Sequence, residues 1–430
     1  MLVSLIGFAI LLLICFAGFP LGWAMVVVGF GGFAFVRGID PALGTVGQLL
    51  LDFSMNYHFS TLPLFILMGT FVYRAALAED MYDAAYAWLG HFRGGLAMAT
   101  VAACGGFAAV SGSSAATAAT MAKVALPSMR RFNYDDRLAA GSVAAGGTIG
   151  ILIPPSIALI IYGILVEEDI GKLFIAGILP GILTIILYIV AIRLVTMFRS
   201  DWGPPGARTE WIERFKALGK VWGIVLLFIF ILGGIYAGVF TPSEAGGIGA
   251  AGALIFAMAR RKLPLDEFFK SLVEAGKTTV FVFTVAYGAI IFSNFINIAG
   301  MPDDILEFVN TLNVPPMGVI FAILVIYVLL GAVFEGIGMI LLTVPIFFPV
   351  VQSLGFDLIW FGIVVIMVTE ISLITPPVGM NVFVLKTMLP DVSLWTIFRG
   401  IGPFFCADLV RLALVVFFPA IALWLPSFMK

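Results

Sequence analysis

Four interruptions of apolar stretches carry the residues of this 430-residue sequence that are best suited to bind small ions. Two are the proline pairs Pro154-Pro155 and Pro376-Pro377, and two are runs of small and polar residues at 109–117 and 332–339. Proline has no N–H and ends a helix, so carbonyl groups beside each pair lose their helical donors. Free carbonyl oxygens suit a small hard cation such as sodium. Free N–H groups at helix N-termini suit an anion such as a carboxylate.

The carbonyl oxygens that we expect to be free belong to Gly150, Ile153, Ser372 and Thr375, which flank the two proline pairs. Irregular backbone inside a membrane is tolerated where it lines a cavity or binds something, because an unpaired backbone group costs several kcal/mol there. The alternative is that the prolines only kink two helices and have no role in binding.

Glu335 lies in the second polar run, inside an otherwise apolar stretch. An ionisable side chain within a membrane is costly unless it is functional or paired. We expect it to contact a bound solute, to have a proton-linked role, or to be a hydrogen-bonded structural carboxylate.

The composition predicts an all-α polytopic membrane protein. The apolar fraction is 62%, the charged fraction is 11% and the mean hydropathy is +1.13, against about 45–50% apolar and about 25% charged residues in soluble domains. A cytosolic enzyme and a secreted domain are therefore excluded, and a bilayer is the expected surrounding. A net charge of −2 suggests no nucleic-acid partner, and three scattered cysteines with two histidines predict neither a disulfide framework nor a zinc site.

The elements that position these residues are short helices that meet inside the membrane. Residues 95–126 are long enough to cross a bilayer but are polar in the middle, so we predict a re-entrant hairpin of two helices rather than one helix packed through small residues. Its second-half counterpart is 317–350. Residues 137–165 and 357–388 are predicted to be helices broken at the proline pairs. The charged stretches 79–93 and 301–313 are predicted to lie along the membrane interface.

The sequence repeats at an offset of 222 residues. Pro127 aligns with Pro349, Pro155 with Pro377, and the polar run at 110–117 with 332–339. Aligned breakpoints at one offset indicate duplication. We therefore predict a first repeat at 1–199, with scaffold helices in 1–93, a cytoplasmic linker at 200–220 and a second repeat at 221–430.

The distribution of basic residues predicts that the two repeats are inverted. With five crossings and one returning hairpin per repeat, 19 of the 23 Lys and Arg residues collect on one face and three, Arg37, Lys172 and Lys430, on the other. The positive-inside rule makes the richer face cytoplasmic and places both termini outside. The remaining Arg411 lies in the last span, where we predict an intrahelical pair with Asp408. Glu244, after Thr241-Pro242, is predicted to cap a helix.

Several motifs resemble those of the large, DctM-type membrane subunit of tripartite ATP-independent periplasmic (TRAP) transporters. They are Gly-Gly-Thr-Ile-Gly-Ile-Leu-Ile-Pro-Pro-Ser at 146–156, Ile-Gly-Lys-Leu-Phe-Ile-Ala-Gly-Ile-Leu-Pro-Gly at 170–181, Thr-Pro-Ser-Glu-Ala at 241–245 and Ile-Thr-Pro-Pro-Val-Gly-Met-Asn at 374–381. The resemblance covers essentially the whole chain. It implies an elevator fold of inverted repeats, with two re-entrant hairpins and two broken helices, in the bacterial inner membrane. It also implies a sodium-driven secondary transporter for organic acids, with a small membrane subunit and a periplasmic substrate-binding protein as partners.

The resemblance also implies where ligands bind. Sodium would lie where each hairpin meets the adjacent broken helix, largely on backbone oxygens: Ser111, Ser114, Gly150, Ile153 and Pro155 in the first repeat, and Gly331, Gly336, Ser372, Thr375 and Val378 in the second. Expected substrate contacts are Ser111, Ser113, Ser114, Ser156, Glu335 and Asn381.

Three other functions remain as alternatives or are excluded. A stand-alone divalent-anion/sodium symporter of the elevator type shares the hairpin plan, and only the motifs argue against it. An intramembrane serine protease is disfavoured, because Ala109 replaces the first glycine of its signature and no span carries a histidine base. An ATP-driven pump is excluded for this chain, which has no phosphate-binding loop of the Walker type.

Overall fold

The computed structural model describes residues 2–75, 77–312, 314–331 and 334–429, with the side chains of 108–111, 310 and 312 excepted. No strand occurs among these residues, so the all-α prediction is confirmed. In the first half the α-helices are α1 (Leu2–Phe16), α2 (Leu21–Arg37), α3 (Ile39–Met55), α4 (Thr61–Arg74), α5 (Leu77–Leu89), α6 (Gly95–Ser111), α7 (Ser114–Arg131), α8 (Asp136–Thr148), α9 (Ile157–Val166) and α10 (Ile170–Phe198).

The second half follows the same order. Its helices are α11 (Trp211–Tyr236), α12 (Pro242–Ala259), α13 (Leu265–Ile298), α14 (Met301–Leu312), α15 (Pro316–Gly331), α16 (Gly336–Ser353), α17 (Leu358–Ser372), α18 (Met380–Met388), α19 (Leu394–Phe417) and the single turn α20 (Ala420–Leu423). Short 3₁₀ turns lie at Tyr57–Ser60, Ile149–Ile151, Ser200–Trp202 and Pro426–Phe428. Helix α11 therefore begins at Trp211, within the predicted linker at 200–220.

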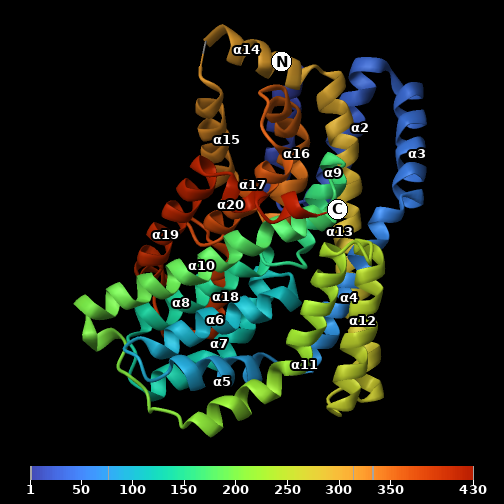
Figure 1. Ribbon diagram of the computed structural model, residues 1–430. Coiled ribbons are helices and arrows are strands. Elements are labelled where there is room, and N and C mark those ends of the chain that lie inside the picture. The colour runs from blue at the N-terminus through green and yellow to red at the C-terminus, as the bar shows by residue number, and fades with distance from the viewer. Residues whose placement is uncertain (1, 76, 313, 332–333, 430) are drawn as a thin grey trace.

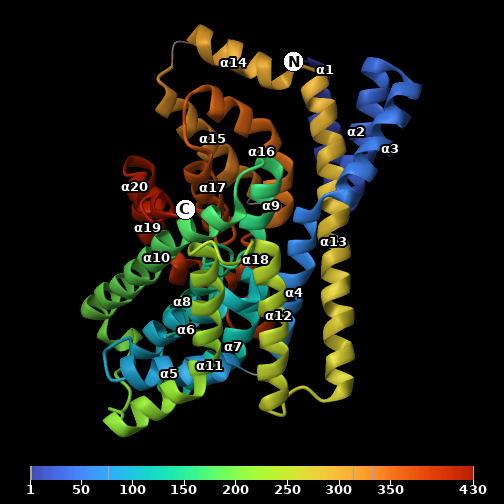
Figure 2. The same ribbon diagram turned by 45° about the vertical axis from the view of Figure 1, so that its right-hand side comes forward.

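Helix boundaries in the two halves agree at the offset of 222 residues. Helix α7 begins at Ser114 and α16 at Gly336, and α8 and α17 begin at Asp136 and Leu358. The residues that cap these helices are also equivalent, because Asp135 and Asp357 each accept a backbone N–H in the first turn. Figures 1 and 2 place α5 at one end of the molecule and its equivalent, α14, at the opposite end.

One difference between the halves lies at Asn56. The first half breaks there, because the Asn56 side chain accepts the N–H of His58 at 2.9 Å and so caps a new turn before α4. The equivalent residue, Thr278, donates its hydroxyl to the carbonyl of Glu274 at 3.0 Å within α13. Polar side chains that bond to a local carbonyl in this way leave a helix intact, and α13 continues for 34 residues.

Two helix pairs connect the halves on one side of the molecule. Helix α2 packs along α13, and α4 packs along α12. Helices α2 and α13 approach closely at Gly29, which has no side chain. A Cβ at this position would lie 2.7 Å from the backbone nitrogen of Phe292. Small residues at such crossings let helices approach in a membrane.

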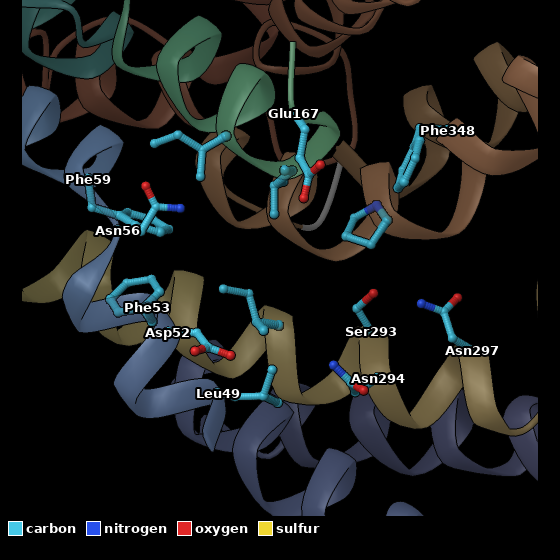
Figure 3. A pocket seen from close by; sticks show the side chains of 14 residues that line it. Leu49, Asp52, Phe53, Asn56, Phe59, Glu167, Ser293, Asn294, Asn297 and Phe348 are labelled. Carbon is cyan, nitrogen blue, oxygen red and sulfur yellow. The ribbon is translucent and has the colours of Figure 1, made fainter. Parts of the chain in front are cut away.

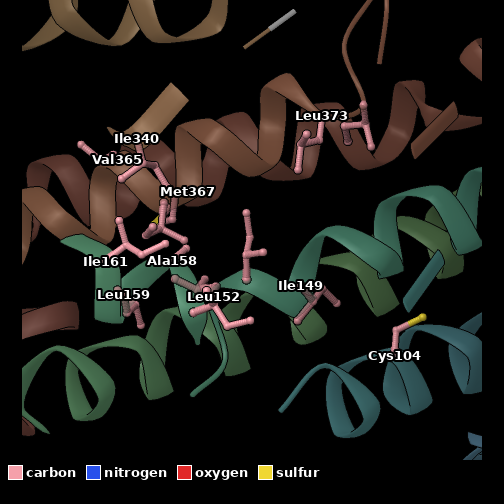
Figure 4. Packing of buried hydrophobic residues seen from close by; sticks show 14 of the residues in the cluster. Cys104, Ile149, Leu152, Ala158, Leu159, Ile161, Ile340, Val365, Met367 and Leu373 are labelled. Atoms are coloured by element: carbon pink, nitrogen blue, oxygen red, sulfur yellow. The ribbon is translucent and has the colours of Figure 1, made fainter. Parts of the chain in front are cut away.

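The hairpin helices and broken helices form the other side. The second helix of each hairpin packs against the final segment of the other half's broken helix, α7 against α18 and α16 against α9. Apolar side chains of both broken helices meet in the core between them, among them Leu152, Leu159, Val365 and Met367 (Figure 4).

Among the described residues, five helices are long and apolar enough to cross a membrane: α10, α11, α13, α16 and α19. Helices α1 and α2, with 15 and 17 residues, are shorter apolar helices. The predicted cap at Glu244 and the predicted Asp408–Arg411 pair are both confirmed. Glu244 forms a capping box with Thr241, and Arg411 Nη2 lies 3.0 Å from Asp408 Oδ1.

Candidate functional site

The first candidate site is the tip between α6 and α7. Gly112 turns the chain there with a φ of +57°, a value that glycine adopts without strain. Ser113 then caps α7. Its hydroxyl oxygen accepts the N–H of Ala116 at 3.4 Å, and its carbonyl oxygen accepts the hydroxyl of Thr117 at 2.8 Å. Ser114 is the first, buried residue of α7, whereas the side chain of Ser111 lies outside the described residues.

The first broken helix touches this tip at Gly150. A Cβ on Gly150 would lie 3.3 Å from the Ser113 carbonyl oxygen and 3.1 Å from Thr117 Oγ1. Any larger residue would fill the space between the two segments. The tip and the break therefore bring carbonyl and hydroxyl oxygens together, as oxygen coordination of a cation requires.

The remaining first-half residues hold the break in shape. Ser156 is fully buried, caps α9 by accepting the N–H of Leu159 at 3.3 Å, and donates its hydroxyl to the carbonyl of Ile151. Pro155 is buried, and its peptide bond with Pro154 is cis. The side chain of Ile153 packs toward α10, where a Cβ on Gly181 would lie 2.6 Å from it. The Ser156 hydroxyl thus uses its hydrogen atom and one lone pair within the break.

The second candidate site is built from the equivalent segments. Glu335 occupies the position of Ser113 and caps α16, where its carboxylate accepts the N–H of Gly338 at 3.2 Å. A Cβ on Gly331 would overlap the hydroxyl oxygen of Ser372. A Cβ on Gly336 would lie 3.0 Å from the Thr369 methyl group. Residues 332 and 333 of this tip lie outside the described residues.

The second break is more open than the first. Thr375 is half-buried and donates its hydroxyl to the carbonyl of Ile371 at 2.6 Å. The side chain of Val378 is 39% exposed, and Pro376 and Pro377, joined by a cis bond, are exposed as well. Asn381 is fully buried instead, and its amide nitrogen donates to the carbonyl of Ala144 in α8 at 3.2 Å. The Asn381 side chain therefore joins the second break to the first broken helix.

A cavity of about 270 Å³ opens beside the first tip. It lies between α7 and the helices α4 and α13. Its lining residues are Ile66, Gly69, Thr70, Tyr73, Ser113, Ala116, Ala119, Thr120, Ile157, Glu274 and Thr278. Hydroxyl-bearing residues line this cavity from α4, α7 and α13, and among the expected substrate contacts with described side chains only Ser113 lines it.

A second cavity, of about 320 Å³, lies between α3, α13, α16 and the end of α9. Figure 3 shows Asp52 and Asn56 on one side of it, Ser293, Asn294 and Asn297 along α13, and Glu167 opposite. Asp52 and Asn56 are equivalent to Glu274 and Thr278 of the first cavity. The same two positions of each repeat therefore line a polar cavity. In the first repeat they are Asp52 and Asn56, at the second cavity, and in the second repeat they are Glu274 and Thr278, at the first cavity.

The family model of the tripartite ATP-independent periplasmic transporter DctM component matches residues 8–421. The chain belongs to this family. It is 37% identical over 88% of its length to the C4-dicarboxylate TRAP transporter large permease DctM of Pseudomonas aeruginosa, of which it covers 88%. It is 31% identical to the sialic acid TRAP large permease SiaM of Vibrio cholerae, with 96% of each chain aligned. It is 32% identical to the ectoine/5-hydroxyectoine large permease UehC of Ruegeria pomeroyi, with 97% of each aligned.

A solved structure has a similar fold. The Alcanivorax borkumensis YdaH transporter superimposes with a TM-score of 0.65 at 12% identity, over 91% of this chain and 90% of that one. The family membership, rather than this likeness of fold, makes the chain a membrane permease component of a TRAP transporter and not an enzyme.

Sequence reasoning missed several polar residues of this TRAP subunit. Thr117 closes the first tip, and Thr70 and Tyr73 line the first cavity from α4. Glu370 is a fully buried acid near the end of α17. An acidic residue in an apolar helix is a visible signal in the sequence, whereas nothing local marks Thr70 or Tyr73 as cavity residues.

Proposed function

We propose that this chain is the large membrane subunit of a sodium-coupled secondary transporter that imports an organic acid anion, a carboxylate or a sulfonate. The observation that carries this proposal is the pairing of each hairpin tip with a broken helix, Ser113 with Gly150 and Gly331 with Ser372. The names of the relatives support the substrate class, since C4-dicarboxylates, sialic acid and ectoine all carry carboxylate groups.

Sodium would be held at the two tip–break junctions. The residues there fit the ion, because they offer neutral carbonyl and hydroxyl oxygens in spaces that a Cβ would fill at Gly150 and Gly331. The first ion would use the tip at 111–114 with Gly150, Ile153 and Pro155. The second would use Gly331 and Gly336 with Ser372, Thr375 and Val378. A bound cation at each junction would lower the cost of bringing an anion to the neighbouring helix N-termini.

The organic anion would occupy the cavity beside Ser113. A volume of about 270 Å³ suits a small organic acid. Thr120 lines this cavity with a hydroxyl group, and Ser113 places the N-terminus of α7, which favours an anion, beside it. Glu335, which caps α16 at the second tip, would contact the bound solute there through its carboxyl group.

An elevator motion would carry this site across the membrane. The hairpins and broken helices would move as one body against a scaffold that includes α2, α4, α12 and α13, since these scaffold helices pack closely on one another. The first cavity reaches Glu274 and Thr278, which also line the surface beside Arg74 and Lys270. The basic residues make this the cytoplasmic end under the positive-inside rule, so the described conformation would be open inward.

The subunit would work in the bacterial inner membrane with both termini in the periplasm. Its partners would be the small TRAP membrane subunit and a periplasmic substrate-binding protein, which the family membership supports. The competing function is a stand-alone divalent-anion/sodium symporter of the same elevator type.

Uptake into proteoliposomes separates these functions. We expect labelled organic acid to accumulate only when the small subunit, the binding protein and an inward sodium gradient are all present. Potassium in place of sodium and an imposed proton gradient serve as controls. Full-rate uptake by the isolated chain would establish the stand-alone symporter, and equal uptake driven by protons without sodium would refute sodium coupling.

A further inference from the structure

Three fully buried charged side chains form a cluster behind the second broken helix. Glu370 comes from α17, and Asp408 and Arg411 come from α19. Arg411 Nη1 lies 2.7 Å from Glu370 Oε2, and Arg411 Nη2 lies 3.0 Å from Asp408 Oδ1. The guanidinium therefore bridges two carboxyl groups on two helices.

Helix α10 completes the cluster with two hydroxyl groups. Arg411 Nη1 also donates to Thr184 Oγ1 at 2.5 Å, and the hydroxyl of Tyr188 donates to Asp408 Oδ2 at 2.7 Å. The cluster thus ties α10, α17 and α19 together. Removing one partner of a buried ion pair leaves an uncompensated charge, which is strongly unfavourable. The three helices are therefore held in one relative orientation.

The equivalent positions of the first half cannot form such a cluster. The positions equivalent to Glu370, Asp408 and Arg411 are Thr148, Ile186 and Ile189, none of which carries a charge. In the first broken helix, the segment α8 is instead in direct backbone contact with α19. A Cβ on Gly141 of α8 would overlap the carbonyl oxygen of Gly400 of α19.

The second half cannot use that glycine contact. The residues equivalent to Gly141 and Gly400 are Ile363 and Ile178, so α17 and α10 lack the pair of glycines that lets α8 touch the backbone of α19. The charged cluster supplies the missing connection through long side chains, so each broken helix is fixed by a different means.

Glu370 is close to the second tip–break junction. It lies two residues before Ser372, in the last turn of α17. The carbonyl of the preceding residue, Thr369, accepts the Ser372 hydroxyl at 2.7 Å, and the Thr369 methyl group faces Gly336. A rotation of this turn would move Ser372 away from Gly331.

We propose that Glu370 and Arg411 are positioning residues for the second sodium site: their ion pair fixes the last turn of α17 so that Ser372 and Thr375 face the hairpin tip. This inference rests on the proposed sodium coupling. Groups that orient the ligands of a metal affect its affinity by about 10–100-fold when they are removed. The first sodium site, whose helix has the glycine contact, does not depend on the pair.

The test compares Glu370→Gln with the wild-type chain. In the variant Arg411 keeps Asp408 as its partner, so no charge is left alone. We expect the half-saturating sodium concentration for uptake by the complete transporter to rise by about tenfold. The KM for the organic acid at saturating sodium should stay unchanged, a split that a general loss of folded protein would not produce. Glu267→Gln, which removes a half-buried partner of Arg74 in the scaffold, is the matched control.

Thermal unfolding of the purified chain in sodium and in potassium gives the second measurement. Glu370→Gln should gain less stability from sodium than the wild type does, with the melting temperature of each protein in potassium as its own reference. Glu370→Asp, which keeps the charge but draws the carboxylate back from Arg411, is the second variant and should show the same loss of sodium response. A normal half-saturating sodium concentration in a folded variant overturns the positioning role. Absence of any sodium response in the wild-type chain refutes sodium coupling itself.

Discussion

Gly331 and Ser372 are in such close contact that a Cβ on Gly331 would overlap the serine hydroxyl oxygen. The equivalent positions in the first half carry Ala109 and Gly150. The glycine therefore lies on the hairpin in one half and on the broken helix in the other. In each half one member of the pair lacks a side chain, and the two segments can approach.

Gly331→Ala should destabilise the protein. The added methyl group must displace Ser372, and overpacking of this kind costs about 1–3 kcal/mol. The double variant Gly331→Ala/Ser372→Gly recreates the residue pair of the first half and should regain most of the lost stability. Thermal unfolding of both variants beside Gly247→Ala, where a Cβ meets nothing within 4 Å, measures this. A double variant no more stable than the single one would contradict the contact.

Thr375→Val should weaken the sodium dependence of uptake more than Ile153→Val does. The Thr375 hydroxyl donates to Ile371 and keeps lone pairs for a cation, whereas the equivalent Ile153 offers only its carbonyl. Loss of one oxygen ligand should cost about 1–3 kcal/mol of sodium binding. A sodium titration of uptake measures it, with Thr375→Ser as the control that retains the hydroxyl. Equal half-saturating concentrations for the two valine variants would remove Thr375 from the site.

Membrane orientation can be tested by cysteine labelling in a background without Cys15, Cys104 and Cys406. Arg208→Cys, exposed after α10, should not react with an impermeant maleimide added to intact cells, because we expect it in the cytoplasm. Lys172→Cys, exposed at the start of α10, should react. Labelling of position 208 from outside would overturn the inverted topology.

A crosslink between the two proposed bodies should arrest transport. A Cβ on Gly338 would lie 2.6 Å from Leu21 Cδ2, so the hairpin helix α16 touches the scaffold helix α2 at this point. Oxidation of Leu21→Cys/Gly338→Cys should stop uptake, and a reductant should restore it. Thr61→Cys/Ser243→Cys joins two scaffold helices whose hydroxyls are 2.5 Å apart, and its oxidation should leave uptake unchanged. If the first crosslink formed without slowing turnover, the elevator motion would be excluded.

The sequence by itself determined the membrane class, the breaks and the repeat. Apolar composition and proline pairs act locally, because a chain with 62% apolar residues must be in lipid and a proline stops a helix wherever it lies. The constant offset of 222 residues aligns Pro155 with Pro377 in the sequence alone, and no information about packing is needed to see it. The capping role of Glu244 was likewise readable from its three-residue distance to Thr241.

Only the tertiary structure decided which oxygens meet. The Ser113 carbonyl faces Gly150, Asn381 crosses to α8, and Arg411 joins Glu370 from 41 residues away. The identity of the residues does not determine these contacts, because they depend on how helices from both halves cross. The repeat in the sequence predicts two equivalent halves. In the structure, however, the first broken helix contacts α19 through Gly141 and Gly400, and the second is held by the buried Glu370–Arg411 ion pair. A single side chain at a crossing point decides how closely two helices approach, and that is a property of the assembled fold.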